Sequence, residues 1–195
     1  MVGAAERLGV SPDQPSSVAQ EALWAQRGAA GDRDALRAIA LAHQDAVYRL
    51  LLRLAGEREL ALDLAQDTFV KAFQAMPSFR AGAAMRPWLF KIANNLFLDH
   101  VRKRQPASLE ELAEAGEDPG AEDPQLTRLG EGLDLAQALA QLPVTWRQAL
   151  VLRHDDDMTY DQIADVLSVP IGTVKTWLYR GRERLKELLA GKEEA

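Results

Sequence analysis

Apolar residues recur every three or four positions along most of this chain, and no stretch alternates strictly between apolar and polar residues. The first pattern is typical of amphipathic helices, and strict alternation would have indicated half-buried strands. Candidate helix starts are Ser17 with Gln20 and, later, Asp32, and candidate ends are Gly28 and Gly56. The sequence therefore predicts an all-α fold, with helices over about 17–28, 32–56, 58–76 and 88–104.

The helix expected over 58–76 carries apolar residues on more than one side. A helix of that kind is usually buried, so we expect it at the centre of a bundle, with one side left for a partner.

A stretch rich in proline, glycine and acidic residues divides the helical pattern in two. Such a composition is typical of a flexible linker. We predict two small helical domains joined by an acidic flexible linker, the second domain containing a helix-turn-helix. The expected ranges are a disordered N-terminal extension over 1–16, a first domain over 17–105, the linker over 106–132 and a second domain over 133–191.

The charge of the chain is segregated along this organisation. The formal net charge of −6 by itself argues against nucleic-acid binding. Residues 106–135, however, hold nine acids and a single basic residue, Arg128, whereas residues 80–104 and 172–192 each hold six Lys or Arg and only one or two acids. This distribution indicates two anion-binding modules separated by an acidic segment.

The C-terminal module contains two short helical patterns separated by a turn. Thr159 and Gln162 can form a capping box for the first pattern, and Pro170 suits the first turn of the second. At about 100° per residue, Val174, Leu178, Gly181 and Leu185 share one arc, with Thr176, Tyr179, Arg180 and Glu183 opposite. The polar arc fits a helix entering the DNA major groove, and an ordinary helical hairpin with a solvated face is the alternative.

Two details of this module have alternative interpretations. Trp177 lies between the two arcs, and we favour packing against the preceding helix over stacking on nucleic acid. His154 and the three aspartates that follow it resemble a metal site. Three adjacent carboxylates cannot converge from one turn, so we favour a solvated turn.

Aromatic, cationic and amide side chains alternate over residues 79–104 beside a loop of small residues. Aromatic faces in a basic groove suit single-stranded DNA, because unstacked bases need flat partners. The alternative is that the aromatic residues, Trp88 and Phe97 in particular, belong to the core.

The composition excludes several classes of protein. The chain has no cysteine, so disulfides, thiolate metal sites and cysteine nucleophiles are excluded. It has no apolar run of membrane-spanning length, and its N-terminus does not resemble a signal peptide, so we expect a cytoplasmic protein. It also has no phosphate-binding loop of the Walker type, and its three histidines lie far apart. We therefore expect no cofactor, no metal and no enzymatic activity.

The segments "ERELALDLAQDTFVKAFQAM", "PWLFKIANNLFLDHVRKR" and "LPVTWRQALVLRHDDDMTYDQIADVLSVPIGTVKTWLYRGRERL" resemble regions 2 and 4 of the extracytoplasmic-function (ECF) class of bacterial sigma factors, within the sigma-70 family. The resemblance covers about 20–190 apart from the linker. Three positions depart from the usual pattern: Ser168 replaces a common glycine, Trp177 a common arginine and Leu62 a common acid.

The resemblance implies a transcription initiation factor that binds core RNA polymerase, directs it to specific promoters and helps to melt the minus-ten element. Its implied partners are the coiled coil of the largest core subunit, the polymerase flap, double- and single-stranded promoter DNA, and an anti-sigma factor. The linker would either enter the basic RNA exit channel or act as a solvated tether. A free-standing helix-turn-helix regulator is the alternative function.

The resemblance also assigns residues to these roles. Core binding falls on Asp63, Gln66, Asp67, Phe69 and Lys71. Minus-ten binding falls on Phe79, Arg80, Arg86, Trp88, Lys91, Asn94, Asn95, Asp99, Arg102 and Lys103. Minus-thirty-five binding falls on Thr173, Lys175, Thr176, Trp177 and Arg180.

Overall fold

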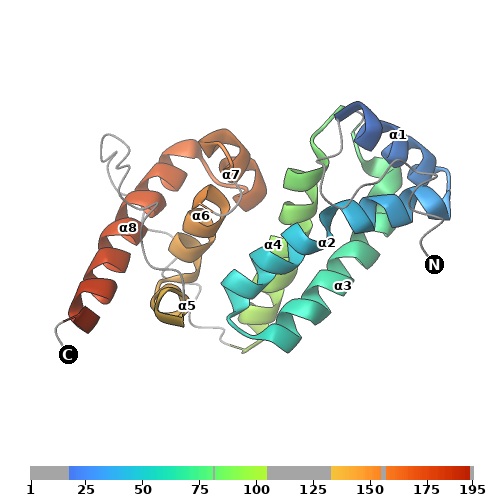
Figure 1. The fold of residues 1–195 in the computed structure, drawn as a ribbon. Helices are drawn as coiled ribbons and strands as arrows, with labels where there is room; N and C mark the ends of the chain where they lie inside the picture. The colour runs from blue at the N-terminus through green and yellow to red at the C-terminus, as the bar shows by residue number, and fades with distance from the viewer. Residues whose placement is uncertain (1–17, 81, 105–132, 155–156, 194–195) are drawn as a thin grey trace.

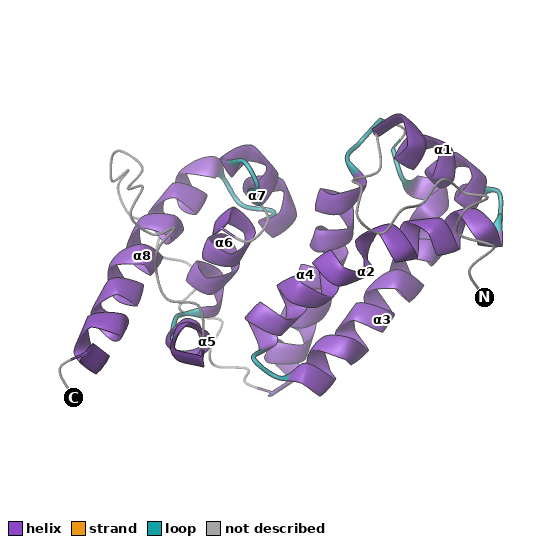
Figure 2. Cartoon of the chain, viewed as in Figure 1, coloured by secondary structure: helices purple, strands orange, loops and turns teal. Residues whose placement is uncertain are grey.

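The structure, a computed structural model, describes residues 18–80, 82–104, 133–154 and 157–193, and every regular element within them is helical (Figures 1 and 2). The prediction of an all-α fold is therefore confirmed. The expected N-terminal extension, the acidic linker and the Ser17 cap lie outside the described residues. The N-terminal module comprises α1 (Val18–Ala29), α2 (Arg33–Ala55), α3 (Arg58–Ala75), the 3₁₀ helix η2 (Met76–Ser78) and α4 (Met85–Arg104). The C-terminal module comprises α5 (Leu133–Ala140), α6 (Val144–His154), α7 (Tyr160–Leu167) and α8 (Ile171–Glu193).

Local signals set both ends of α2. The Asp32 carboxylate accepts hydrogen bonds from the backbone N–H groups of Asp34 and Ala35, at 2.9 and 3.2 Å. A hydrogen bond from the Arg27 side chain, together with these backbone bonds, lowers the pKa of Asp32 below its usual value. At the other end Gly56 adopts a left-handed conformation with φ of 70°. Glycine suits this position because it has no Cβ to clash there.

The core of the N-terminal module is built around α2, not around α3. Helix α2 packs against α1, α3 and α4, and it buries Ile39, Val47, Leu50, Leu51 and Leu54. The prediction of a central helix over 58–76 is therefore wrong. Helix α3 buries mainly alanines, which let it approach α2 closely, and it keeps one face exposed.

The C-terminal module is packed around α6. Ala149, Leu150, Val151 and Leu152 are buried along it. The arc of α8 predicted to face inward does so, since Val174, Leu178, Gly181 and Leu185 are all buried. The two modules also touch: α7 lies against α4, and α5 and α6 lie against α2 (Figure 1).

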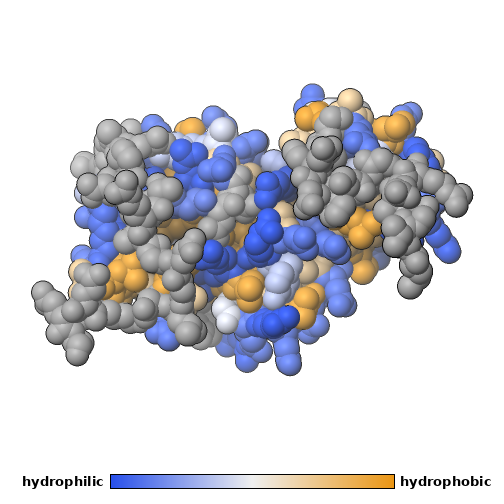
Figure 3. Space-filling model, viewed as in Figure 1, coloured by the Kyte–Doolittle hydropathy of each residue, from blue (hydrophilic) through white to orange (hydrophobic). Residues whose placement is uncertain are grey.

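None of the helices in the described residues combines the length and the apolar character needed to cross a membrane. Figure 3 shows a largely hydrophilic face with separate apolar patches. The large apolar side chains that remain exposed in the described residues lie on α1, α2, α3 and α8, and they include Leu23, Leu62, Val70, Ile171 and Tyr179.

Candidate nucleic-acid interface

Polar side chains form a continuous exposed stripe along α4. Lys91, Asn95, Asp99 and Lys103 are exposed and follow one another at intervals of four residues, so they share one face of the helix. Arg102 borders the stripe, and its Nη1 donates to Asp99 Oδ1 at 3.0 Å. The stripe thus offers cationic and amide groups to a ligand along the length of α4.

Asn94 lies beside this stripe but is covered. Its assignment to minus-ten binding requires an accessible side chain, but only 2% of Asn94 is exposed. Its Oδ1 accepts a hydrogen bond of 2.6 Å from Nε2 of Gln148, on α6. The C-terminal module therefore occupies the Asn94 amide.

Aromatic and cationic groups meet where α4 begins. The rings of Phe79 and Trp88 form an edge-to-face pair with centroids 4.9 Å apart. The Arg86 guanidinium lies over the Phe90 ring at 5.4 Å from its centroid. Phe79, Trp88 and Arg86 are half-buried, whereas Arg80 is exposed. Phe97 is a core residue, as the alternative interpretation expected.

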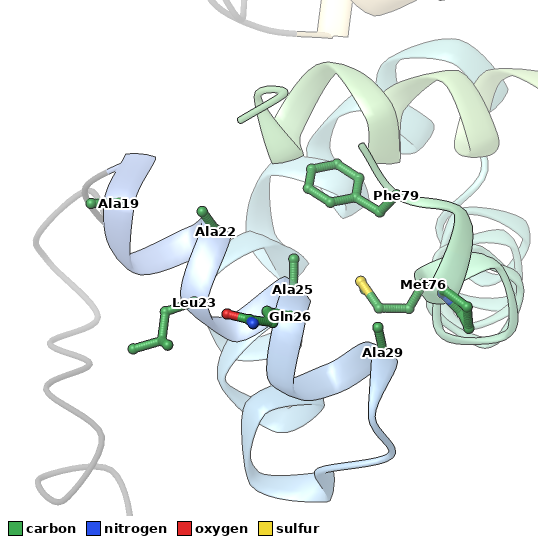
Figure 4. A pocket seen from close by; sticks show the side chains of 9 residues that line it. Ala19, Ala22, Leu23, Ala25, Gln26, Ala29, Met76 and Phe79 are labelled. Carbon is green, nitrogen blue, oxygen red and sulfur yellow. The ribbon is translucent and has the colours of Figure 1, made fainter. Parts of the chain in front are cut away.

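Phe79 also borders a pocket of about 580 Å³ between α1 and η2 (Figure 4). Helix α1 contributes mainly small side chains, and Met76, Pro77 and Phe79 line the opposite side. Sequence reasoning missed this pocket. Its only local signal is the row of alanines at positions 19, 22, 25 and 29.

Helices α7 and α8 form the predicted helix-turn-helix. The Thr159 hydroxyl accepts from the Gln162 backbone N–H at 3.3 Å, and the Thr159 N–H donates to the Gln162 side chain at 2.9 Å. The predicted capping box is thus confirmed. Ser168 ends α7 in a left-handed conformation, with φ of 56°. Together these features fix the angle at which α8 leaves the turn.

The first half of α8 exposes fewer residues than predicted. Thr173, Lys175 and Arg180 are half-buried, and Tyr179 is 46% exposed. Thr176, expected to face outward, is buried, and its hydroxyl donates to the Gly172 carbonyl at 3.0 Å. Trp177 is buried too, as the packing interpretation favoured. Thr176 and Trp177 are buried because α8 packs against α5, α6 and α7. These three neighbours cover a wider part of the surface of α8 than the single apolar arc predicted from the sequence.

The exposed side of α3 carries the candidate core-binding residues. Asp63, Gln66, Asp67 and Lys71 are exposed, and Phe69 is half-buried with its ring 6.0 Å from that of Phe73. The apolar Leu62 and Val70 lie on the same exposed side, at 44% and 54% exposure. The sequence analysis did not identify Val70, although its spacing of eight residues from Leu62 is a helical repeat. The face mixes apolar and acidic groups, which suits a protein partner better than DNA.

The part of the chain that the structure describes contains no candidate metal site. Within it, no group of three or more His, Asp or Glu side chains could hold an ion. Two of the three aspartates after His154 lie outside the described residues.

Two helical modules, one with a cationic stripe next to aromatic side chains and the other with a helix-turn-helix, define a bipartite nucleic-acid-binding protein. Residues 39–107 match the sigma-70 region 2 family, and residues 132–185 match the sigma-70 region 4 family. The second match begins where the described C-terminal module begins.

Similar proteins agree with these matches. The chain is 39% identical to the ECF sigma factor SigE of Mycolicibacterium smegmatis over 76% of its own length and 59% of that protein's. It is 32% identical to the ECF sigma factor SigW of Bacillus subtilis over 82% of its own length and 91% of that protein's. It is also 32% identical to the sigma-H factor of Pseudomonas aeruginosa, over 87% and 94% of the two chains.

Solved structures show the same fold. The sigma factor RpoE of Bartonella quintana, crystallised with the anti-sigma factor NepR, superposes with a TM-score of 0.62 at 30% identity, over 77% of this chain and 94% of that one. The structure of CnrH with the cytosolic domain of CnrY gives a TM-score of 0.66 at 25% identity, over 88% and 97%.

The chain belongs to the ECF class of RNA polymerase sigma factors. Members of this family are non-enzymatic transcription factors. The chain is therefore a promoter-directing initiation factor of RNA polymerase. The alternative function, a free-standing helix-turn-helix regulator, is not favoured.

Proposed function

We propose that this chain binds core RNA polymerase through the exposed face of α3 and positions promoter DNA on α4 and α8. The observation that supports the proposal is the pair of polar surfaces on separate modules, one on α4 and one on α8, with the mixed apolar and acidic face of α3 on the same module as the first. Two surfaces on two modules suit two promoter elements. Because core polymerase would be the partner, the chain would act in the cytoplasm.

On α4 the minus-ten element would meet the stripe of Lys91, Asn95, Asp99, Arg102 and Lys103. Lysine and arginine would contact phosphates, and the amide of Asn95 could reach a base edge. At the start of the helix, Phe79 and Trp88 with Arg80 and Arg86 would receive an unstacked base.

On α8 the minus-thirty-five element would meet Thr173, Lys175 and Arg180, to which we add the exposed Tyr179. Thr176 and Trp177, buried in this conformation, would act by holding α8 against its neighbours. A recognition helix reads bases from residues near its N-terminus, which is where these side chains lie.

The energetics of melting require the polymerase. Separating a DNA duplex costs about 1.4 kcal/mol per base-pair step. A base stacked on an aromatic ring returns about 1 to 3 kcal/mol. One or two bases captured at Phe79 and Trp88 would therefore nucleate melting without sustaining a bubble, so the chain alone would not open a promoter.

We also propose an anti-sigma factor as a regulatory partner. One solved relative described above is a complex of the sigma factor RpoE with the anti-sigma factor NepR, and the other is a complex of CnrH with the cytosolic domain of CnrY. A partner of this kind would cover the exposed surfaces that serve DNA and polymerase.

Run-off transcription tests the proposal. Bacterial core polymerase is incubated with fragmented genomic DNA, with and without the purified chain, and the new transcripts are mapped. Transcripts that start downstream of a shared sequence motif are the expected result. If the chain neither binds core nor yields new transcripts, but binds one duplex sequence tightly by itself, the regulator replaces the sigma factor as the function.

A double substitution then tests the α4 stripe. Lys91→Ala with Asn95→Ala should reduce transcription from the mapped promoter by about 10-fold or more, because a phosphate contact and a base contact are both lost. Core binding, measured by co-purification, should be unchanged. Gln44→Ala, an exposed amide on α2, is the control and should retain full transcription. Equal transcription by the two variants would remove the stripe from the proposal.

A further inference from the structure

Helix α4 carries a single acidic residue among several basic ones. Asp99 is the only Asp or Glu in this helix, which also contains Arg86, Lys91, Arg102, Lys103 and Arg104. The Asp99 side chain is 52% exposed and lies within the exposed stripe, between Asn95 and Lys103. A carboxylate at this position repels the phosphates of any nucleic acid that binds along α4. The position of Asp99 therefore requires a compensating role.

The carboxylate of Asp99 is paired with a neighbouring guanidinium. Arg102 Nη1 donates to Asp99 Oδ1 at 3.0 Å, and the two residues are three positions apart, so they are neighbours on the helix surface. Both side chains are more than half exposed, Arg102 at 58% and Asp99 at 52%. Ion pairs as exposed as this one add little to the stability of a fold, because water screens them and ordering two side chains costs entropy. Stability therefore does not account for the pair.

The pair restrains a group that is well suited to binding phosphate. A guanidinium carries five N–H donors in a planar fork. The bond to Asp99 involves Nη1, so Nε and Nη2 can still donate to a phosphate, which arginine binds through two parallel hydrogen bonds. A freely moving arginine loses rotational freedom when it binds, whereas one that is already held loses less. The bond from Arg102 to Asp99 thus prepares the guanidinium for a contact with DNA.

We propose that Asp99 is a positioning residue, whose carboxylate holds the Arg102 guanidinium in place for one phosphate of the promoter. The gain from a restrained arginine then exceeds the repulsion between the carboxylate and the DNA. The inference rests on the proposed function, because DNA must lie along α4, but the pair itself is a property of the free chain. Removing this negative charge should therefore weaken promoter binding, although removing an acid from a DNA-binding surface ordinarily strengthens it.

The direction of this effect is tested on the holoenzyme, with the promoter that run-off transcription maps. Asp99→Ala removes both the charge and the hydrogen-bond acceptor, and it should bind that promoter about 5-fold more weakly than wild type. The matched control is Asp45→Ala, which makes the same change at an exposed position on α2. The control should bind like wild type. If Asp99→Ala binds as tightly as the control, or more tightly, the proposal is overturned.

A double-mutant cycle shows whether Asp99 acts through Arg102. In a chain that already carries Arg102→Ala, Asp99→Ala has no guanidinium to release, so it should cause no further loss of affinity. In a chain that carries Lys103→Ala, the matched background, Asp99→Ala should still weaken binding about 5-fold. The same loss in both backgrounds would mean that Asp99 acts independently of Arg102, and the positioning role would be wrong.

Salt dependence and stability separate positioning from a structural role. Asp99→Ala should lower the salt dependence of promoter binding by about one unit of slope, because the phosphate contact of Arg102 is lost. Asp99→Glu keeps a carboxylate near Arg102 and should restore most of the affinity and of the slope. Thermal unfolding should give equal midpoints for Asp99→Ala and Asp45→Ala, since an exposed pair stabilises little. An unchanged slope, or a much lower midpoint for Asp99→Ala alone, would contradict the proposal.

The free chain supplies a test that does not depend on the proposed function. Nitrogen-15 relaxation of the Arg102 guanidinium should show restricted motion on the picosecond to nanosecond timescale in wild type and freer motion in Asp99→Ala. Equal mobility in the two proteins would overturn the proposal, whatever happens to promoter binding. If the wild-type holoenzyme binds no promoter, the proposed function fails, while the relaxation measurement still decides whether Asp99 restrains Arg102.

Discussion

Ser168 places a residue with a side chain where the turn of the helix-turn-helix requires a left-handed backbone. Its φ and ψ are 56° and 44°, and its N–H donates to the Ala164 carbonyl. The left-handed region brings Cβ close to the following carbonyl, so a side chain is disfavoured there. The departure from the glycine that is usual in the family therefore costs stability at this turn.

Replacing Ser168 should show this cost. Ser168→Gly is expected to raise the free energy of unfolding by up to about 1 kcal/mol, because the Cβ clash is removed. Ser168→Val should lower it, since a β-branched side chain is the least tolerant of this conformation. Urea unfolding followed by circular dichroism measures both. An unchanged midpoint for the glycine variant would show that the turn is not strained by serine.

Gly181 lies on α8 where this helix packs against Leu150 and Trp146 of α6. A Cβ at this position would lie 2.9 Å from Cδ1 of Leu150 and 3.3 Å from Cβ of Trp146. Leu150 is buried, so it has little room to move aside. The absence of a side chain at Gly181 is thus a packing requirement.

Gly181→Ala is expected to destabilise the protein by about 1 kcal/mol, because overpacking of the helix crossing exceeds the gain in helix propensity. Gly172→Ala is the matched control, since a Cβ there meets nothing within 4 Å. It should be neutral or slightly stabilising. Thermal unfolding compares the two, and a stabilised Gly181→Ala would show that Leu150 repacks freely.

At the scale of elements, α7 depends strongly on its cap. It spans only Tyr160–Leu167, and helices this short are marginal without tertiary contacts and capping. The reciprocal hydrogen bonds between Thr159 and Gln162 satisfy the backbone N–H groups of both residues at the start of the helix, each with the side-chain oxygen of the other residue. The cap therefore stabilises the first helix of the helix-turn-helix and, through the turn, the direction of α8.

Thr159→Ala should lower the free energy of unfolding by about 1 kcal/mol, as for other N-cap residues. Thr159→Ser keeps the hydroxyl acceptor and should retain most of the stability. Chemical denaturation of the two variants tests the expectation. If alanine and serine gave equal stabilities, the capping hydrogen bond would contribute nothing in solution.

At the scale of the whole molecule, a chain with a net charge of −6 still presents cationic groups toward a ligand. The acids are concentrated in the sequence between the two modules, while α4 and α8 keep exposed or half-buried lysines and arginines. Arg182 does not contribute to the exposed set, because only 8% of it is accessible. Binding to DNA should therefore depend on a few specific cations and should weaken with salt.

Lys175→Ala and Arg180→Ala should each lower the salt dependence of promoter binding by the holoenzyme by about one unit of slope. This follows if each side chain neutralises one phosphate. Lys186→Ala, whose ammonium pairs with Glu183 at 3.3 Å on the same helix, is the control and should leave the slope unchanged. Fluorescence anisotropy over a salt series measures the slopes. Equal slopes for all three variants would exclude a phosphate contact by Lys175 and Arg180.

Much of the architecture was predictable from the sequence, because its signals are local. Asp32, Gly56 and the pair of Thr159 with Gln162 act within one helical turn, so they define helix ends wherever the helix lies. The inward arc of α8 was predictable for the same reason, since an α-helix has 3.6 residues per turn and residues three or four positions apart therefore share a face. The exposure of Asp63, Gln66, Asp67 and Lys71 agrees with their placement on an unburied side of α3.

Only the tertiary structure decided which faces a second surface covers. The helical period of a sequence identifies one buried stripe on a helix. Helix α2, however, has neighbours on several sides, and Thr176 of α8 is buried although it lies opposite the apolar arc. Asn94 is covered by Gln148, which is 54 positions away in the sequence. The bond from Arg147 to Leu54 spans 93 positions. Contacts at such separations depend on how whole modules dock, and the free energy of docking is a sum over many residues that no local pattern contains. The sequence by itself therefore determined the helices and the chemistry on them, and the docking of the two modules determined which of those groups are free to meet DNA.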